Sequence, residues 1–319
     1  MYNLGIDLGG TNIAVGVVDE NNKIIGRGKV KTNCPRPAEE IADDMAKAAK
    51  MAVEDAKLTF DDIESVGVGA PGSINPFTGM IATSNNLQFS NVNMGKMLKD
   101  RLGFDVYLEN DASAAAYGEY IAGAGVGTNN FVAITLGTGV GGGIIIDGKL
   151  FSGSNLGGGE LGHTVIVVDG AQCTCGRKGC WEAYASATGL INMTKEQMLK
   201  DKQSKMWELC DNDLNKVNGR TSYDGMRAND ESAKKVVDKY VKYLSCGITN
   251  AVNIFQPDVL CIGGGVSKEG DTLLKPVIEY VVRERFTKNI EKQTEVKIAE
   301  LGNDAGIIGA AALYRLYKK

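Results

Sequence analysis

The chain carries near its start the stretch Leu4-Gly-Ile-Asp-Leu-Gly-Gly-Thr-Asn-Ile-Ala-Val-Gly-Val-Val18, which predicts a buried strand, a tight glycine turn and a second strand. The second half of the chain repeats this order in Phe131-Val-Ala-Ile-Thr-Leu-Gly-Thr-Gly-Val-Gly-Gly-Gly-Ile-Ile-Ile146. A third strand and then helices and strands follow in both halves. A repeat that occurs only twice is typical of a duplicated lobe and not of a solenoid. The sequence therefore predicts two α/β lobes with a cleft between them.

Hydrophobic spacing places the other elements and suggests where each lobe begins and ends. It predicts helices over residues 38–56, 233–255, 272–286 and 305–317, and strands over residues 63–69, 259–262 and 296–299. We expect one lobe to comprise residues 1–112 and 303–319, and the other to comprise residues 113–302. The segment 194–232 is polar and irregular apart from a short helical stretch, and we expect it to cover the surface of the second lobe.

The composition is ordinary for a soluble α/β protein, except for 41 glycines in 319 residues. The formal net charge of −4 gives no field that would attract nucleic acid or an anionic membrane. No apolar run reaches the roughly 18 residues that span a bilayer, and the immediate strand pattern leaves no room for a signal peptide. We expect a cytoplasmic protein with no disulfide framework among its scattered cysteines, which are Cys34, Cys210, Cys246 and Cys261.

Glycine-rich turns at three places are suited to hold phosphate groups. Gly9, Gly10 and Thr11 follow the first strand and leave backbone N–H groups free to point at an anion, with the threonine hydroxyl as a further donor. Gly137 and Thr138 occupy the matching place in the second half, and a third glycine turn lies between a buried strand and a helix later in the chain. The alternative is that the first two are ordinary hairpins. Neither a Walker-A loop nor a Gly-x-Gly-x-x-Gly fingerprint occurs in the required context, which argues against P-loop enzymes and Rossmann dehydrogenases.

Carboxylates lie at two places where strands are expected to end. Asp7 ends the first strand and either caps the turn or holds Mg²⁺ beside a phosphate, directly or through water. Asn110 and Asp111 lie where a later strand meets an alanine-rich helix. Asp111 either caps this helix or acts as a general base that accepts the proton of an attacking hydroxyl. In the second case, Asn110 offers its amide to a neighbouring hydroxyl.

A single segment combines the only histidine of the chain with three of its seven cysteines, and these residues are His163, Cys173, Cys175 and Cys180. Three thiolates and one imidazole are the ligands that Zn²⁺ prefers in closed tetrahedral sites. The alternative is four buried or reactive side chains that are near one another by chance. The spacing is not that of a nucleic-acid-binding finger. Trp181 follows the last cysteine, and the sequence leaves open whether it is inert packing or alters the site.

Further polar residues flank the metal segment or lie in a loop. Glu160 precedes the histidine by three residues, Glu182 follows Cys180 by two residues, and Asn86 lies in Ser-Asn-Asn-Leu. Carboxylates on both sides of a metal loop suit recognition of a polyhydroxyl ligand, because each oxygen accepts hydrogen bonds from hydroxyl groups. The alternative is that they are solvated loop charges.

Together these segments resemble the ROK family of repressors, open-reading-frame kinases and sugar kinases, and within it the bacterial glucokinases. The resemblance covers nearly the whole chain. It implies an α/β, two-lobed sugar-kinase/actin-like ATPase (ribonuclease H-like) fold, with ATP in the cleft between the lobes and a zinc loop. The motifs that carry it are Asp7-Leu-Gly-Gly-Thr11, Gly69-Ala-Pro-Gly72, Leu108-Glu-Asn-Asp-Ala-Ser-Ala-Ala-Ala116, Leu136-Gly-Thr-Gly-Val-Gly-Gly-Gly143, Glu160-Leu-Gly-His163, Cys173-Thr-Cys-Gly-Arg-Lys-Gly-Cys-Trp-Glu182 and Gly263-Gly-Gly-Val-Ser267.

The resemblance also implies a role for each candidate residue. Asp111 is the catalytic base, and the zinc is structural. The zinc ligands are His163, Cys173, Cys175 and Cys180. The residues that line the sugar site are Asn86, Asn110, Glu160, His163 and Glu182. The residues that touch ATP are Gly9, Gly10, Thr11, Gly137, Thr138 and Gly264.

The activity that the resemblance implies is transfer of the γ-phosphoryl group of ATP to the 6-hydroxyl of D-glucose. N-acetylmannosamine, fructose and allose are alternative substrates within the same family. A transcriptional repressor would carry a winged helix-turn-helix before the first strand, where we expect no room for it. A non-catalytic sugar sensor is disfavoured by the intact Asp111 and phosphate turns. We expect a homodimer or higher homo-oligomer with no nucleic-acid or membrane partner.

Overall fold

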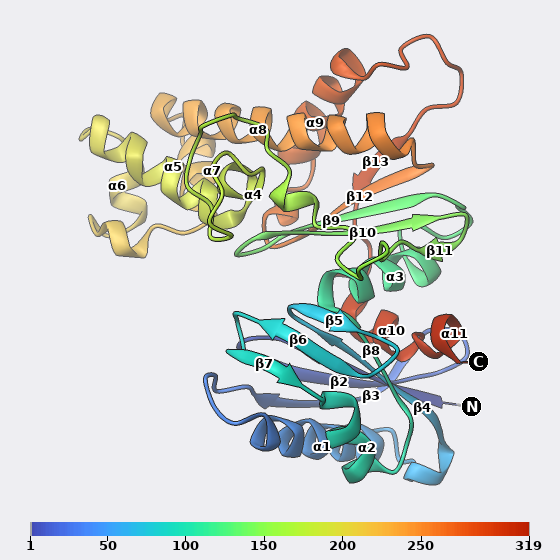
Figure 1. Cartoon of the computed structure of the whole chain (residues 1–319). Coiled ribbons are helices and arrows are strands. Elements are labelled where there is room, and N and C mark those ends of the chain that lie inside the picture. The colour runs from blue at the N-terminus through green and yellow to red at the C-terminus, as the bar shows by residue number, and fades with distance from the viewer. Residues whose placement is uncertain (1, 319) are drawn as a thin grey trace. The chain divides into compact units, whose positions relative to one another are not determined.

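The computed structural model describes residues 2–318, which form two compact units (Figure 1). The first unit contains Met1–Phe131, Gly143–Gly159 and Glu300–Lys319, and the second contains Val132–Gly142 and Glu160–Ala299. The described strands form two five-stranded sheets and one three-stranded sheet. Within residues 2–318, no helix combines the length and the apolar composition needed to cross a membrane.

The first five-stranded sheet brings the ends of three parallel strands to one edge. Its order is β3-β2-β1-β4-β8, with the strands β1 (Tyr2–Leu8), β2 (Asn12–Val18), β3 (Ile24–Lys31), β4 (Ile63–Ala70) and β8 (Val106–Asn110). β1 is antiparallel to β2 and parallel to β4, and β4 is parallel to β8. Asp7 is in register with Gly69, which is in register with Glu109. The carboxyl ends of β1, β4 and β8 therefore place Asp7 close to Asn110 and Asp111, at the edge where open α/β sheets bind ligands.

Helices cover both faces of this sheet (Figure 1). They are α1 (Ala38–Asp55), α2 (Met94–Leu102), α3 (Asp111–Ala122), α10 (Ala305–Ala311) and α11 (Tyr314–Tyr317). The buried stripe of α1 packs with Leu4, Ile6 and Leu8 of β1 in one hydrophobic core. The same unit carries the sheet β5-β6-β7, with β5 (Ser73–Asn75), β6 (Met80–Ser84) and β7 (Phe89–Val92).

Helix α10 approaches the opposite face of the sheet so closely that only glycine fits beneath it. A Cβ atom on Gly5 would lie 1.9 Å from the carbonyl oxygen of Ile307, and one on Gly67 would lie 1.8 Å from that of Ala310. Because side chains alternate along a strand, Asp7 lies on the same face of β1 as Gly5. The close approach of α10 therefore also buries the carboxylate of Asp7.

The second five-stranded sheet repeats the order of the first. It runs β11-β10-β9-β12-β13, with β9 (Phe131–Leu136), β10 (Val140–Ile146), β11 (Lys149–Leu150), β12 (Val259–Gly264) and β13 (Glu295–Ile298). Both sheets begin with three strands in reverse chain order, β3-β2-β1 in the first sheet and β11-β10-β9 in the second. β10 is antiparallel to β11, and β12 is parallel to β13. This order confirms the predicted duplication of an α/β lobe.

The second unit carries its own helices around a loop that holds the histidine and cysteine segment. The α-helices are α4 (Glu182–Ala185), α5 (Ala187–Lys200), α6 (Met206–Leu209), α7 (Thr221–Arg227), α8 (Glu231–Phe255) and α9 (Asp271–Glu284). Short 3₁₀ turns lie at Leu161–His163, Leu214–Lys216 and Val266–Glu269, and in the first unit at Phe60–Asp62 and Gly302–Asp304.

The two units divide the chain at other positions than the sequence suggested. Helix α3 and the segment Gly143–Gly159 group with the first unit. The reason for α3 is its packing against α10, since a Cβ atom on Gly309 would lie 1.7 Å from the carbonyl oxygen of Ala114. The last helix also differs from the expected single helix over 305–317, because a separate α11 follows α10. The N–H of Ala312 is shared between two carbonyl oxygens at 3.1 and 3.2 Å, which tightens the last turn of α10.

The segment 194–232 is more ordered than its polar sequence suggests. It contains the end of α5, together with α6 and α7, and these helices share a small hydrophobic core with the start of α8. This core consists of Met198, Met206, Cys210, Val217 and Ala233. Sequence periodicity misses these helices because α6 has 4 residues and α7 has 7, which is too short for a 3.6-residue repeat to show.

Candidate functional site

Two hydrogen bonds from Thr32, which the sequence did not indicate, fix the first glycine turn. Thr32 donates its hydroxyl to the carbonyl oxygen of Gly9 at 2.6 Å and its N–H to that of Thr11 at 3.0 Å. The carbonyl oxygens of Gly9 and Thr11 therefore both accept hydrogen bonds from Thr32. Asn86 lies beside the turn, because a Cβ atom on Gly10 would be 3.8 Å from the Cβ of Asn86. Thr32 lies outside the local motif, so only the folded β2–β3 pair reveals it.

Asp7 and Asp111 form a pair of interacting carboxylates at the edge of the first sheet. Burial, and then the charge of Asp111, raise the pKa of Asp7 from 3.8 to about 6. Two neighbouring carboxylates of this kind are a donor set that fits a divalent cation, since the cation offsets their repulsion. Hard oxygen ligands are those that Mg²⁺ prefers.

The cap of α3 is Asn110 and not Asp111, which is the first helical residue. The Asn110 side-chain oxygen accepts the N–H groups of Ala112 at 2.9 Å and Ser113 at 3.2 Å. Its side-chain nitrogen donates to the carbonyl oxygen of Gly72 at 3.1 Å. One N–H of the Asn110 amide is left for a ligand. The alternative that Asp111 is the helix cap is therefore wrong, although its Oδ1 also accepts the Ala112 N–H at 2.8 Å.

The histidine and the three cysteines of the second unit come together with the geometry of a tetrahedral metal site. Their ligand atoms all lie within 4.8 Å of one another. His163 Nδ1 is 3.7 Å from the sulfur of Cys173, and the sulfurs of Cys175 and Cys180 are 3.6 Å apart. A tetrahedron with Zn–S bonds of about 2.3 Å separates its sulfur ligands by about 3.7 Å. The donor set and the spacing therefore both fit zinc.

Tight backbone turns bring the thiols of this loop together. Gly179 has a φ of +80°, and a Cβ atom on it would lie 1.7 Å from the carbonyl oxygen of Val167. The N–H of Cys173 donates to the carbonyl oxygen of Arg177 at 2.8 Å. Burial raises the pKa of the Cys180 thiol to about 12, so this thiol needs a bound cation to ionise at neutral pH.

The carboxylate of Glu182 is anchored at the end of the second glycine turn. Its Oε2 accepts the N–H of Val140 at 3.1 Å, and its Oε1 accepts the hydroxyl of Thr174 at 3.1 Å. A Cβ atom on Gly139 would lie 2.3 Å from Oε2, so any larger residue there would displace this carboxylate. Glu182 is therefore a positioned acceptor and not a solvated loop charge.

His163 faces two different partners with its two ring nitrogens. Nδ1 lies toward Cys173, and Nε2 is 4.0 Å from a carboxylate oxygen of Glu160. The carboxylate side chain of Glu160 is 60% exposed and open to a ligand. A histidine that gives one nitrogen to a metal presents the other as a donor, which suits a second role at a ligand.

The second and third glycine turns lie next to each other in the second unit. The N–H of Gly265 donates to the carbonyl oxygen of Leu136 at 3.0 Å, just before Gly137. Gly264 has a φ of +90°, and a Cβ atom on it would lie 2.4 Å from the same Leu136 oxygen. The hydroxyl of Thr188 donates to the carbonyl oxygen of Thr138 at 2.8 Å. Residues 137, 138 and 264, predicted separately from the sequence, thus form one cluster.

The predicted site residues fall into two local groups, one in each unit. The group of the first unit contains Asp7, Gly9, Gly10, Thr11, Asn86, Asn110 and Asp111. The group of the second unit contains Gly137, Thr138, Glu160, His163, Cys173, Cys175, Cys180, Glu182 and Gly264. The structure adds Thr32, Gly139 and Thr188, whose contacts hold the turns in shape.

Comparison with known proteins identifies the class that this fold and these groups define. The model of the ROK family matches residues 3–316. The chain is 37% identical over 314 residues to a glucokinase of Halalkalibacterium halodurans, covering 98% of this chain and 94% of that protein. The chain therefore belongs to the ROK family, and it has the two-lobed α/β fold of ROK sugar kinases.

Solved structures agree with this assignment. The ROK family glucokinase from Streptomyces griseus in complex with glucose and AMPPNP is 35% identical, with a TM-score of 0.85 and 99% of each chain covered. The ROK hexokinase from Thermus thermophilus is 31% identical, with a TM-score of 0.80 and coverage of 98% of this chain and 97% of that one. The similarity therefore extends over nearly the whole chain.

The metal site generates a prediction of zinc content. We expect one equivalent of zinc per chain, and Cys175→Ser should remove it, because a lost thiolate breaks the four-ligand set and the loop depends on the ion for its folding. Elemental analysis of the purified proteins measures this. Cys246→Ser is the matched control, since Cys246 lies outside the cluster. Zinc retained in Cys175→Ser, or lost in the control, would contradict the assignment.

The buried carboxylate of Asp7 generates a prediction of pH dependence. Its folded-state pKa of about 6 lies above the ordinary 3.8, so it stabilises the folded state at low pH and this contribution is lost as the pH rises through 6. Asp7→Asn should therefore match the wild type near pH 4 and exceed its free energy of unfolding by about 3 kcal/mol at pH 8. Urea unfolding at both pH values, without Mg²⁺ or nucleotide, measures the difference. The exposed Asp61→Asn is the control, and an Asp7→Asn effect that does not change with pH refutes the prediction.

Proposed function

We propose that this protein is an ATP-dependent glucokinase that transfers the γ-phosphoryl group of ATP to the 6-hydroxyl of D-glucose. The observation that carries the proposal is the position of Asp111, which interacts with Asp7 at the end of the strand that leads into the first glycine turn. A carboxylate beside a phosphate-type turn supplies the general base that phosphoryl transfer to a hydroxyl requires. The glucokinase relatives and the glucose and AMPPNP complex support the choice of sugar and donor.

In this proposal Asp111 accepts the proton of the 6-hydroxyl as that oxygen attacks the γ-phosphorus, and ADP leaves. The backbone N–H groups at Gly10 and Thr11 donate to phosphate oxygens, since Thr32 keeps the neighbouring carbonyl oxygens engaged. Asp7 would hold Mg²⁺ beside the phosphates, directly or through water. When bound, Mg²⁺ neutralises charge that develops on the phosphate oxygens.

The proposed glucose ligands are Asn86, Asn110, Glu160, His163 and Glu182. Each offers a polar atom, and for Asn110 this is the N–H that does not donate to Gly72. Zinc is structural in the proposal, and it holds the loop that presents Glu160 and Glu182. A site that hydrogen-bonds each hydroxyl rejects an analogue that lacks one, because its own polar groups are then left unpaired.

Other members of the ROK family define the alternatives. An N-acetylmannosamine, fructose or allose kinase would use the same carboxylates and the same turns. Xylose repressors are also among the relatives, so a sugar-responsive protein without catalysis is a further alternative. The proposal includes a cytoplasmic location, where thiols stay reduced. It also includes a homodimer or higher homo-oligomer, supported by exposed apolar residues of the second unit, which include Val168, Ile254 and Phe286.

The proposed base can be tested by Asp111→Asn. We expect kcat to fall by about 10² or more while the affinity for ATP stays near that of the wild type, because loss of a general base usually costs 10²–10⁴ in rate. The melting temperature should change little, because Asn110 caps α3. A coupled assay gives kcat, and titration calorimetry gives the ATP affinity. Asp105→Asn, on the exposed turn before β8, is the control, and normal turnover by Asp111→Asn would exclude Asp111 as the base.

The proposed substrate can be tested with a panel of sugars. We expect kcat/KM to be highest for glucose among glucose, mannose, fructose, allose and N-acetylmannosamine, because each misplaced hydroxyl leaves polar groups of the site unpaired. A tenfold preference for N-acetylmannosamine would change the substrate but keep the chemistry. If no sugar is phosphorylated, the kinase proposal fails and the sensor alternative takes its place.

A further inference from the structure

We propose that Trp181 is a positioning residue for the metal loop and for Glu182, held in place by its contact with Gly247 of α8. The inference rests on the proposed function, because Glu182 is one of the proposed glucose ligands. The sequence leaves open whether Trp181 is inert packing or alters the site. Its contacts in the folded second unit indicate that Trp181 affects the site.

Trp181 connects the metal loop to the long helix behind it. In sequence it lies between the metal ligand Cys180 and the proposed sugar ligand Glu182. It is 1% exposed, and its indole N–H donates to the backbone carbonyl oxygen of Tyr243 in α8 at 3.1 Å. Its own backbone N–H donates to the carbonyl oxygen of Thr164, just after His163, at 2.8 Å. A shift of this residue therefore shifts both ends of the metal segment.

The indole lies directly on the backbone of α8 at Gly247. A Cβ atom on Gly247 would be 2.1 Å from Cε2, 2.3 Å from Cδ2 and 2.5 Å from Nε1 of Trp181. Glycine inside a helix is less favourable than alanine because it loses more backbone entropy on folding. The indole explains why glycine stands in the interior of the 25-residue helix α8 at this position.

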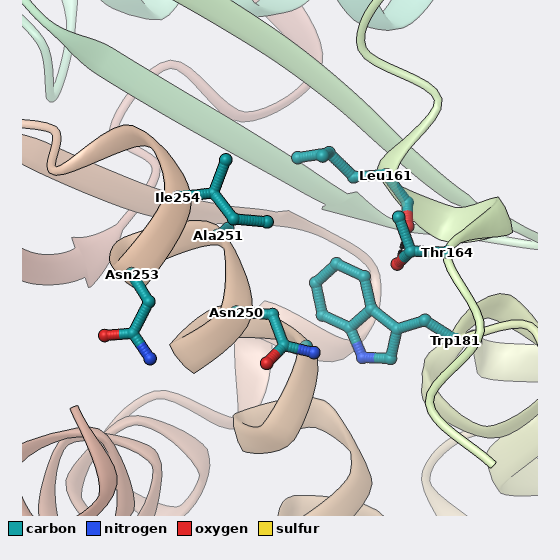
Figure 2. A pocket seen from close by; sticks show the side chains of 8 residues that line it. Leu161, Thr164, Trp181, Asn250, Ala251, Asn253 and Ile254 are labelled. Carbon is teal, nitrogen blue, oxygen red and sulfur yellow. Dashed lines mark hydrogen bonds between the residues drawn. The ribbon is translucent and has the colours of Figure 1, made fainter. Parts of the chain in front are cut away.

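A cavity beside the indole gives the ring room to move. Its volume is about 160 Å³, and Figure 2 shows the indole facing side chains of α8 and of the loop across it. The lining residues besides Trp181 and Gly247 are Leu161, Thr164, Asn250, Ala251, Asn253 and Ile254. A Cβ atom added at Gly247 can therefore push the indole toward the cavity while the unit still folds. The backbone at Trp181 then moves with the ring, and the 3.1 Å contact between Glu182 and the N–H of Val140 is lost.

The test is Gly247→Ala, alone and combined with Trp181→Leu. We expect the single variant to raise the KM for glucose about tenfold, while kcat and the KM for ATP change by less than about twofold. Zinc should stay at one equivalent per chain but should pass to a chelator several times faster than from the wild type. In Trp181→Leu the clash with the new methyl group is absent, so adding Gly247→Ala to that variant should change its KM for glucose and its rate of zinc release by less than about threefold. A general structural effect would not separate the two KM values or depend on the indole in this way.

Asn250→Ala is the matched control, because Asn250 lines the same cavity from the same helix and is neither a proposed ligand nor the residue beneath the indole. It should leave all measured values at those of the wild type. The inference is overturned if Gly247→Ala keeps the wild-type KM for glucose and rate of zinc release. It is also overturned if Asn250→Ala has the same effect or if Gly247→Ala acts as strongly in Trp181→Leu as in the wild type. If the wild type phosphorylates no sugar, the proposed function fails, and the zinc-release rates of the same variants still decide the role of Trp181.

Discussion

The close packing of α10 against β1, β4 and α3 is the constraint on which the first unit depends. Glycines on the sheet and on the helices remove the Cβ atoms that would keep these backbones apart, as at Gly67 beneath Ala310. The same contact covers Asp7, because a Cβ atom on Gly306 would lie only 3.2 Å from the Asp7 carboxyl carbon. Burial is the main cause of the raised pKa of Asp7. The packing that stabilises this unit therefore also disfavours the ionised form of this carboxylate, which is the form that a divalent cation would stabilise.

A different interaction organises the loop of the second unit. This loop contains a short 3₁₀ turn and isolated bridges, such as Val165 with Cys180, and little regular secondary structure. The histidine and the three thiols fit a metal ion, and such an ion would supply the energy that a hydrophobic core supplies elsewhere. The anchored carboxylate of Glu182 lies against this cluster, with Cys173 Sγ 3.5 Å from its Oε1. Stability of the loop and the position of a proposed sugar ligand are therefore coupled.

Some residues of the candidate site could be predicted from the sequence, and others could not. The metal ligands could be predicted because a rare histidine and three cysteines of fitting chemistry lie within one segment. Asn110 and Asp111 were found, but their roles at the helix start were not separated, since both residue types cap helices well. Only the hydrogen bonds of the folded chain show that Asn110 is the cap. Thr32 could not be found, because its partners at Gly9 and Thr11 lie in another strand pair.

The sequence by itself determined the duplicated α/β order, the glycine turns and the metal ligand set, because these depend on periodicity and on residue chemistry within short windows. Tertiary structure alone decided that α3 packs with α10, that Glu182 is anchored on the turn at Val140, and that the indole of Trp181 lies on Gly247. These contacts join residues that are between about 40 and 200 positions apart. Their geometry depends on how closely two backbones approach, and that distance is set by packing and not by the local sequence of either segment.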